Sequence, residues 1–188
     1  MIRDVQAHTH RLWHSLESRG LGVRRAYAGA VGFPASERDD ALMVRALALA
    51  TQARDADDVP VGALVTDAAG SVIGEGRNLR EISHDPTAHA EVVAMRQAAA
   101  SVGSWNLEGC TLVVTLEPCL MCAGALLQAH VSRLVFGAWD EKAGAAGSLY
   151  DVVRDRRLPS RAEVVAGVRA DEASALLRDF FESRRSHG

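Results

Sequence analysis

One stretch of the sequence restricts the possible folds more than any other, because strand-like and helix-like patterns follow each other there without a break. TLVVTLE (111–117) is β-branched and largely apolar, which is typical of a buried central strand. Pro118 is well tolerated at a first helical position, so it predicts a helix over residues 119–130. RLVFGAWD (133–140) predicts a second strand. A strand, a helix and a strand in succession favour an α/β fold.

The rest of the chain extends this alternation. Ser36 can cap a helix whose apolar residues recur at three- and four-residue spacing until about residue 55. Residues 59–67 and 71–78 predict a hairpin. The remaining predicted elements are a loop over 81–87, a helix over 88–103, a short helix over 149–155, a strand over 162–168 and an amphipathic helix over 171–185. This order predicts a mixed sheet sandwiched between helices.

Length and composition predict one globular domain with an extension in front of it. The chain has 188 residues, of which 48% are apolar and 24% charged, and its formal net charge is -3. Residues 1–36 show no sustained period, and we expect a poorly ordered N-terminal extension, or alternatively a targeting or RNA-binding arm that uses its arginines. Residues 37–188 form the predicted catalytic domain.

Membrane and secretory signals are not found in the sequence. No window offers the ~18 consecutive apolar residues that a membrane-spanning helix requires, and the first 20 residues lack the apolar segment of a secretory signal. The three cysteines, Cys110, Cys119 and Cys122, fit metal or redox chemistry better than a disulfide framework. We therefore expect a cytoplasmic protein.

Two short segments carry the chemistry, and each opens a predicted helix: His89-Ala90-Glu91 and Pro118-Cys119-Leu120-Met121-Cys122. Cys119 and Cys122 are three residues apart, so both lie on one side of a helical turn, where the helix N-terminus favours the thiolate form. Zinc takes thiolate and imidazole ligands in a tetrahedral set, and catalytic zinc sites leave the fourth place to water. Three ligands, His89, Cys119 and Cys122, therefore predict an open, catalytic zinc site.

Cys110 and Glu91 complete this prediction. Cys110 opens the strand that leads to Cys119, so at ~3.3 Å per residue it should lie roughly 20 Å from the ligands, as a packed thiol. Glu91 is predicted to move protons between the water, the substrate and the leaving amine. Ideal helix geometry separates positions 89 and 91 by about 200°, so the two side chains converge only if His89 lies at the unwound helix start.

Each piece has another interpretation when it stands alone. A Cys-x-x-Cys pair also occurs in thiol–disulfide oxidoreductases and in structural zinc sites, which would make the chain a redox enzyme or a non-catalytic zinc module. The combination of His-x-Glu with Pro-Cys-x-x-Cys is the known signature of zinc deaminases that act on nucleobases. We therefore predict hydrolytic deamination of a base.

The motifs carry a family resemblance that runs from about Asp40 to Arg185. VPVGALV, VIGEGRN, HDPTAHAE, TLEPCLMCAGA, VFGAWDEKAGAAGS and DFFESRR resemble the cytidine deaminase-like superfamily and, within it, the bacterial tRNA-specific adenosine deaminases. The resemblance implies a three-layer α/β/α sandwich around a five-stranded mixed sheet, one Zn²⁺ per subunit and a homodimer. It implies deamination of adenosine to inosine at the wobble position of a tRNA anticodon stem-loop. The alternative is a deaminase of free guanine, cytosine or adenosine.

The resemblance also assigns roles to single residues. It implies that His89, Cys119 and Cys122 bind the metal, that Glu91 is the proton shuttle, and that Asn78 and Asp140 contact the substrate. Two residues depart from the basic character expected beside the RNA: Trp139, which can instead offer a stacking face, and Glu182 in the last helix. Of the neighbouring Phe180 and Phe181, one is expected in the core, and Arg184 and Arg185 are predicted to contact the RNA backbone.

Overall fold

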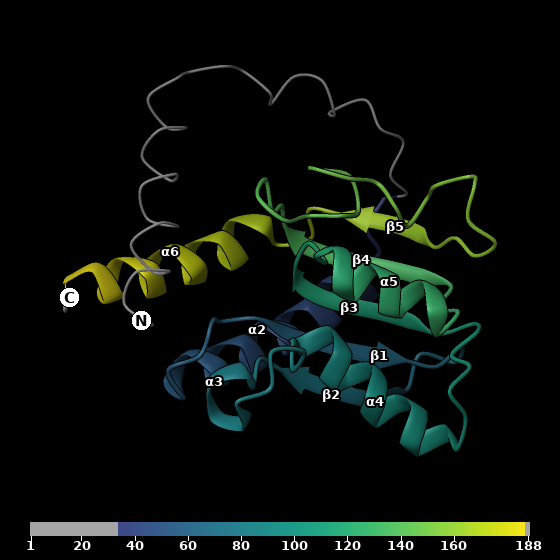
Figure 1. Ribbon diagram of the computed structural model, residues 1–188, viewed down its shortest axis with the longest axis horizontal. Helices are drawn as coiled ribbons and strands as arrows, with labels where there is room; N and C mark the ends of the chain where they lie inside the picture. Colours follow the sequence, from purple (N-terminus) through teal and green to yellow (C-terminus); the bar gives the residue numbers. More distant parts are fainter. Residues whose placement is uncertain (1–33, 187–188) are drawn as a thin grey trace. The chain divides into compact units, whose positions relative to one another are not determined.

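The computed structural model describes residues 34–186, and its five strands form one mixed sheet (Figure 1). The strands are β1 (Gly62–Thr66), β2 (Val72–Arg77), β3 (Thr111–Leu116), β4 (Arg133–Ala138) and β5 (Glu163–Ala166). Their order across the sheet is β2-β1-β3-β4-β5. β1 pairs antiparallel with β2 and β3, whereas β4 pairs parallel with both β3 and β5. The predicted hairpin and the central position of the 111–117 strand are both confirmed.

Helices cover both faces of the sheet and make three layers (Figure 1). The helices are α2 (Glu37–Asp55), α3 (Arg80–Ser83), α4 (Ala90–Val102), α5 (Leu120–Gln128) and α6 (Ala170–Ser186). α4 and α5 lie on one face, and α2 and α6 lie on the other. The predicted α/β/α sandwich is therefore confirmed.

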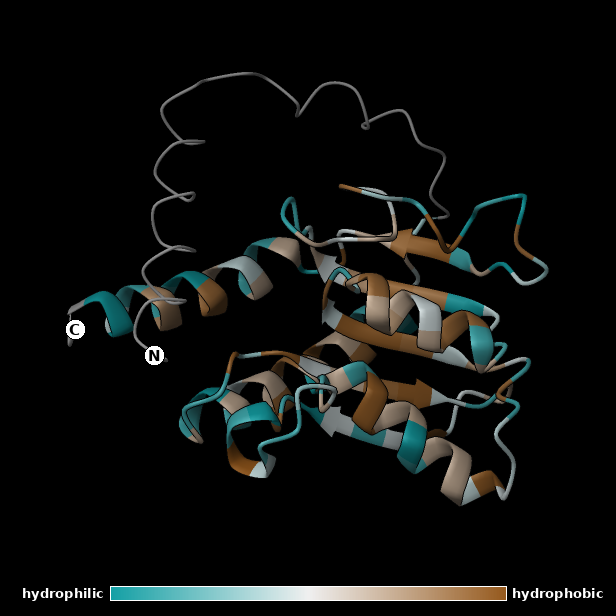
Figure 2. Ribbon diagram, viewed as in Figure 1, coloured by the Kyte–Doolittle hydropathy of each residue, from teal (hydrophilic) through white to brown (hydrophobic). Residues whose placement is uncertain are grey.

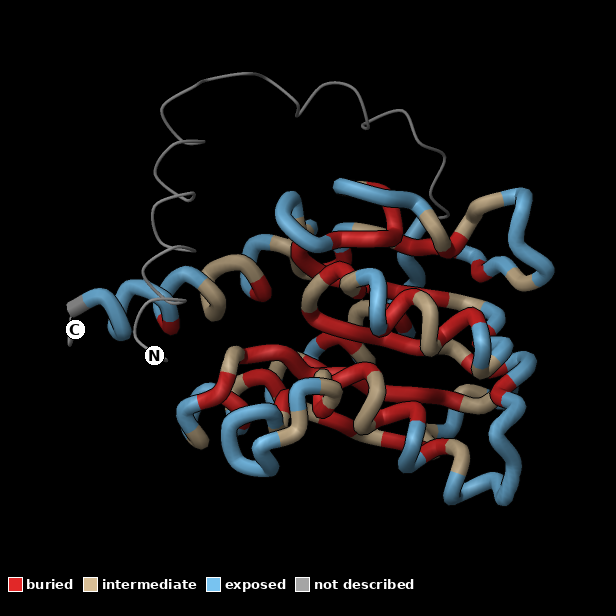
Figure 3. The backbone as a smooth tube through the Cα atoms, viewed as in Figure 1, coloured by how far each residue is buried: buried red, intermediate tan, exposed pale blue. Residues whose placement is uncertain are grey.

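Alternate residues of each strand build two separate apolar cores, one on each face of the sheet. In β3, Leu112 and Val114 pack with residues of α4 and α5, whereas Val113 packs with Met43 and Ala46 of α2. This alternation is the two-residue period of a pleated strand. Figure 2 shows hydrophobic residues along the central strands, and Figure 3 shows that the same strands are buried. The sheet is thus a rigid platform for the helix N-termini that carry the site.

The N-terminus of α2 is fixed to the sheet by a buried carboxylate. Ser36 caps α2 as predicted, in a capping box with Asp39. Asp39 also pairs with Arg133 at the start of β4, with 2.6 Å between Oδ1 and Nη1. The Arg133 guanidinium lowers the pKa of Asp39 to about 2. This pair joins the first described helix to the middle of the domain.

Three local predictions are wrong, two of them because a hydrogen bond to a residue outside the segment decides the backbone. The predicted loop over 81–87 overlaps the short helix α3, where the Glu81 N–H donates to Asp58 Oδ2 at 3.0 Å. The predicted short helix over 149–155 is not a helix, since the Tyr150 and Val152 N–H groups donate to carbonyls of residues 144 and 145. Pro118 is not the first helical residue, because α5 begins at Leu120.

The predicted N-terminal extension, residues 1–36, lies almost wholly outside the described residues, which begin at Pro34. Its order and role therefore stay predictions. Among the helices of the described part of the chain, none is long and apolar enough to cross a membrane.

Candidate metal centre and active site

The N-termini of α4 and α5 bring the three predicted ligands together. His89 is the N-cap of α4 and Cys119 is the N-cap of α5, both with extended backbone, and Cys122 lies in the first turn of α5. His89 Nδ1 is 3.8 Å from Cys119 Sγ and 3.5 Å from Cys122 Sγ. Neither N-cap side chain makes a capping hydrogen bond, so both remain directed at the cluster rather than at their own helices.

This donor set fits zinc. The three ligand atoms all lie within 4.8 Å of one another, and in the described part of the chain they are the only group of this kind. Tetrahedral zinc with Zn–N and Zn–S bonds of ordinary length separates nitrogen from sulfur by about 3.6 Å, which agrees with the two observed distances. This geometry makes His89, Cys119 and Cys122 the residues that would hold the zinc.

The electrostatics of the two sulfurs also suit a cation. The Cys122 thiol and the His89 imidazole donate to Cys119 Sγ, which lowers the pKa of Cys119 to about 3. The same pairing and burial raise the pKa of Cys122. Zinc binds cysteine as the thiolate, so metal binding at this pair displaces any proton that the two sulfurs hold.

Glu91 lies next to this cluster, in the first turn of α4. Its side chain is buried, with 4% of the residue exposed, and burial raises the pKa of its carboxyl to about 7. The His89 charge acts against this rise. The convergence of Glu91 with His89 requires His89 to lie at the helix start, and the N-cap position of His89 meets that requirement. Burial of an acid without an ion-pair partner is costly, which points to a chemical role.

Cys110 is not part of the cluster. It precedes β3, at the end of the strand remote from Cys119, and belongs to the core beneath α4 and α5 with 7% of its surface exposed. The prediction of a packed thiol is confirmed. The zinc site thus has three protein ligands among the described residues, which is the number typical of catalytic zinc.

Asn78, predicted from the resemblance to contact the substrate, has a structural partner at the site. It is buried, and its Oδ1 accepts a 3.0 Å hydrogen bond from the Ala90 N–H. Asn78 therefore satisfies one of the free N–H groups at the start of α4. Gly76 lets β2 approach the same turn, because a Cβ there would lie 2.2 Å from the Ala90 carbonyl oxygen. The position of Glu91 is thus set by β2.

Asp140 lies after β4, and its side chain closes a turn. Its Oδ1 accepts hydrogen bonds from the backbone N–H groups of Lys142 and Ala143, at 3.0 and 3.2 Å. This is the ordinary hydrogen bonding of an aspartate in a turn. The same turn leads to Gly144, which forms an isolated bridge with Cys119. Asp140 therefore belongs to a loop that runs beside a zinc ligand.

Glu117 is the functional residue that the sequence analysis missed. It is 2% exposed and stands between β3 and Cys119. Glu117 Oε1 accepts from the N–H groups of Ala146 and Ser148, and Oε2 accepts from the Asp140 N–H and the Ser148 hydroxyl. Glu117 thus fastens the 140–148 loop to the strand that ends at the metal. The one sequence signal was an acidic residue directly after a buried strand.

Comparison with known proteins agrees with this site. Residues 36–138 match the family described as the cytidine and deoxycytidylate deaminase zinc-binding region. A tRNA-specific adenosine deaminase of Haemophilus influenzae is 47% identical over 150 residues, which cover 80% of this chain and 87% of the relative.

Solved structures give the same result. One from studies of A-to-I editing by tRNA:A34 deaminases is 36% identical, with a TM-score of 0.69, and covers 73% of this chain and 99% of the other. A guanine deaminase from Nitrosomonas europaea is 26% identical, with a TM-score of 0.64, and covers 86% of this chain and 93% of the other. The chain therefore belongs to the cytidine and deoxycytidylate deaminase zinc-binding family and, within it, to the tRNA-specific adenosine deaminases.

Proposed function

We propose that this protein deaminates adenosine to inosine at the wobble position of a tRNA anticodon, by zinc-dependent hydrolysis. The observation that carries this proposal is the three-ligand His–Cys–Cys cluster with the buried Glu91 beside it, in a chain that is 47% identical to a tRNA-specific adenosine deaminase. A purely structural zinc module would need a fourth ligand and no buried acid. A thiol–disulfide oxidoreductase would leave His89 and Glu91 without a role.

The reaction consumes one water and releases ammonia. When bound, zinc supplies the Lewis acidity that activates water near neutral pH. Glu91 accepts one proton from that water and donates it to the ring nitrogen, and it then takes the second proton from the new hydroxyl on C6 and delivers it to the amino group that leaves as ammonia. Because Glu91 is buried, it exchanges these protons with the substrate rather than with bulk water.

Asn78 and Asp140 are proposed to hold the substrate. Asn78 Oδ1 is occupied by the Ala90 N–H, which leaves the amide N–H₂ group as the donor toward the nucleoside. Asp140 is proposed to meet the neighbouring nucleotide from the loop that Glu117 holds. The target base must leave its stack to reach the metal, and a single-stranded anticodon loop makes this inexpensive.

Sequencing of the wobble position tests the proposed function. We expect a tRNA with adenosine at the wobble position to contain inosine, read as guanosine by reverse transcription, after incubation with the zinc-loaded protein. The same tRNA with guanosine at that position serves as the control. The alternative, a free-base deaminase, is favoured by the likeness to the guanine deaminase. Ammonia release from free guanine without inosine in tRNA would support that alternative and contradict the proposal.

We also propose that the protein works in the cytoplasm as a homodimer that associates through α5. One face of α5, with Leu120, Gly124 and Gln128 at four-residue spacing, lines a groove of about 320 Å³ together with Leu158. Leu120 is 50% exposed and Leu158 is 39% exposed. An apolar helix face of this kind is typical of a surface that a partner covers. The three free cysteines suit a reducing compartment.

Sedimentation velocity tests the dimer. We expect the wild-type protein to sediment as a dimer and Leu158→Asp to sediment as a monomer, because a carboxylate would be buried without a partner in the groove. Val44→Asp is the matched control, since Val44 is 47% exposed on α2, on the other side of the sheet. A Leu158→Asp protein that remained dimeric would move the interface elsewhere.

A further inference from the structure

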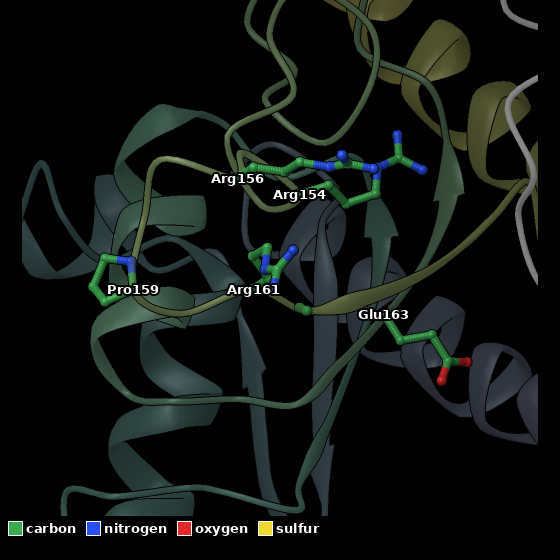
Figure 4. Close-up of a pocket in the computed structure, with 6 residues that line it drawn as sticks. Arg154, Arg156, Pro159, Arg161 and Glu163 are labelled. Carbon is green, nitrogen blue, oxygen red and sulfur yellow. The ribbon is translucent and has the colours of Figure 1, made fainter.

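A second hollow lies outside the zinc centre, in the segment between β4 and β5. It has a volume of about 560 Å³ and is lined by Arg154, Arg156, Pro159, Arg161, Ala162 and Glu163 (Figure 4). Three of the six lining residues are arginines. Residues 154–163 carry four arginines and two acidic residues, whereas the whole chain has a formal net charge of -3. Positive charge is thus concentrated at this surface.

Among the described acidic residues near the hollow, only Asp151 pairs with one of the three arginines, Arg154. Glu163 is directed away from the arginines (Figure 4), and its Oε1 lies 2.9 Å from Arg133 Nε. Asp155, the second acidic residue of the 154–163 segment, forms an ion pair with Arg157. Arg156 and Arg161 are exposed and have no ion-pair or hydrogen-bond partner within residues 34–186. Their guanidinium groups are therefore available to an anion from outside the chain.

Hydrogen bonds connect one wall of the hollow to Glu117, which holds the loop beside the zinc ligand Cys119. Arg154 Nη2 lies 2.9 Å from Asp151 Oδ2 and donates to the Ala146 carbonyl at 3.3 Å. The Ala146 N–H in turn donates to Glu117 Oε1 at 2.9 Å, and Glu117 lies two residues before Cys119 in the chain. Arg154, which lines the hollow, is therefore connected to the residues that position Cys119.

The arginines that the sequence favoured for RNA contacts are engaged within the protein. Arg184 Nη2 lies 2.8 Å from Asp57 Oδ1, and its guanidinium covers the Phe180 ring. Arg185 lies 3.6 Å from Glu182. Phe180 is buried and Phe181 is exposed, so one of the two lies in the core, as predicted. The last helix thus presents fewer free guanidinium groups than its sequence indicates.

We propose that Arg154, Arg156 and Arg161 form a phosphate-binding site for the backbone of the tRNA substrate, separate from the zinc centre. The inference rests on the proposed function, because the phosphodiester is that of the edited RNA. Arg156 and Arg161 supply the free guanidinium forks, whose planar donors match phosphate oxygens. Arg154 is held by Asp151 and lines the hollow beside them. Such contacts position an RNA without reading its sequence, which leaves base recognition to the active site.

The test compares zinc-loaded Arg156→Ala/Arg161→Ala with the wild-type protein, by fluorescence anisotropy with a full-length tRNA at several salt concentrations. We expect the Kd to rise roughly ten-fold and the slope of log K against log salt to fall by about 1 for each arginine removed. The KM for tRNA should rise with kcat nearly unchanged. Arg157→Ala is the matched control, because the substitution removes one charge from the same loop. Arg157 itself pairs with Asp155 and does not line the hollow.

Four outcomes separate this inference from the proposed function. Weaker, less salt-dependent binding in the double variant but not in Arg157→Ala supports the site. An unchanged Kd and salt slope, in a preparation whose wild-type protein forms inosine, overturns it. Loss of the dimer in the double variant would assign the arginines to the partner subunit and also overturn it, since Pro159 lines both hollows. A wild-type protein that forms no inosine contradicts the proposed function instead.

Discussion

Glu91→Gln is expected to bind zinc and tRNA normally and to lose nearly all deaminase activity. Glutamine has the shape of glutamate but cannot accept and return a proton, and general acid–base catalysis by one positioned side chain contributes about 10²–10⁴-fold. We therefore expect kcat to fall by about that factor, with little change in KM. The folded protein should not be less stable, because the substitution removes a carboxyl that is only 4% exposed.

Three measurements decide whether Glu91 is the proton carrier. Metal analysis should find one zinc per chain in both proteins, anisotropy should give the same Kd for tRNA, and single-turnover kinetics should locate the loss in the chemical step. Glu81→Gln is the control, because Glu81 is an exposed glutamate in the adjacent helix α3. A Glu91→Gln protein that kept zinc and deaminated at the wild-type rate would remove Glu91 from the mechanism.

The sequence was sufficient wherever the signal is local. The ligand set could be predicted because His89, Cys119 and Cys122 each stand at the start of a helix that its own periodicity marks. The central strand could be predicted because it is a short β-branched, largely apolar run, as expected when both of its faces are buried in a core. Both kinds of signal lie within a few neighbouring residues, so they are visible without knowing what packs against them.

The sequence was insufficient wherever a group outside the segment determines the local backbone structure. Nothing local indicates that Asp58 anchors α3, or that Asn78 caps α4 in place of His89. The 149–155 segment has the composition of a short helix, but its N–H groups pair with residues 144 and 145. In each case a hydrogen bond to a residue outside the segment outweighs a weak local propensity.

The two helices that carry the metal ligands both begin with a ligand at the N-cap position, but their N-termini are supported by different residues. An N-cap side chain normally satisfies the free N–H groups of its own helix. His89 and Cys119 occupy that position without capping, which directs them at the metal. For α4, Asn78 of the neighbouring hairpin accepts a hydrogen bond from the Ala90 N–H at the helix start. For α5 the loop beside Cys119 is held by Glu117. The supports of the site thus come from residues that directly follow strands, Asn78 after β2 and Glu117 after β3.

Glu117→Gln is therefore expected to destabilise the protein and weaken the zinc site, although Glu117 touches neither metal nor substrate. Both of its oxygens accept a backbone N–H, from Ala146 and Ser148 on one side and from Asp140 on the other. Whichever way a glutamine turns, its N–H₂ group faces a backbone N–H, so at least one buried donor is left unsatisfied. This should lower the free energy of unfolding by about 2–3 kcal/mol.

Chemical denaturation of the zinc-loaded protein measures that loss, and competition with a chromogenic chelator measures zinc affinity. Groups that support metal ligands typically change metal affinity by about 10–100-fold, and a loss in this range is expected here. Ser148→Ala removes only the hydroxyl donor and should cost about 1 kcal/mol. Glu108→Gln, at an exposed glutamate, should change neither quantity. If Glu117→Gln kept wild-type stability and zinc affinity, the 140–148 loop would have to be held by contacts other than this carboxylate.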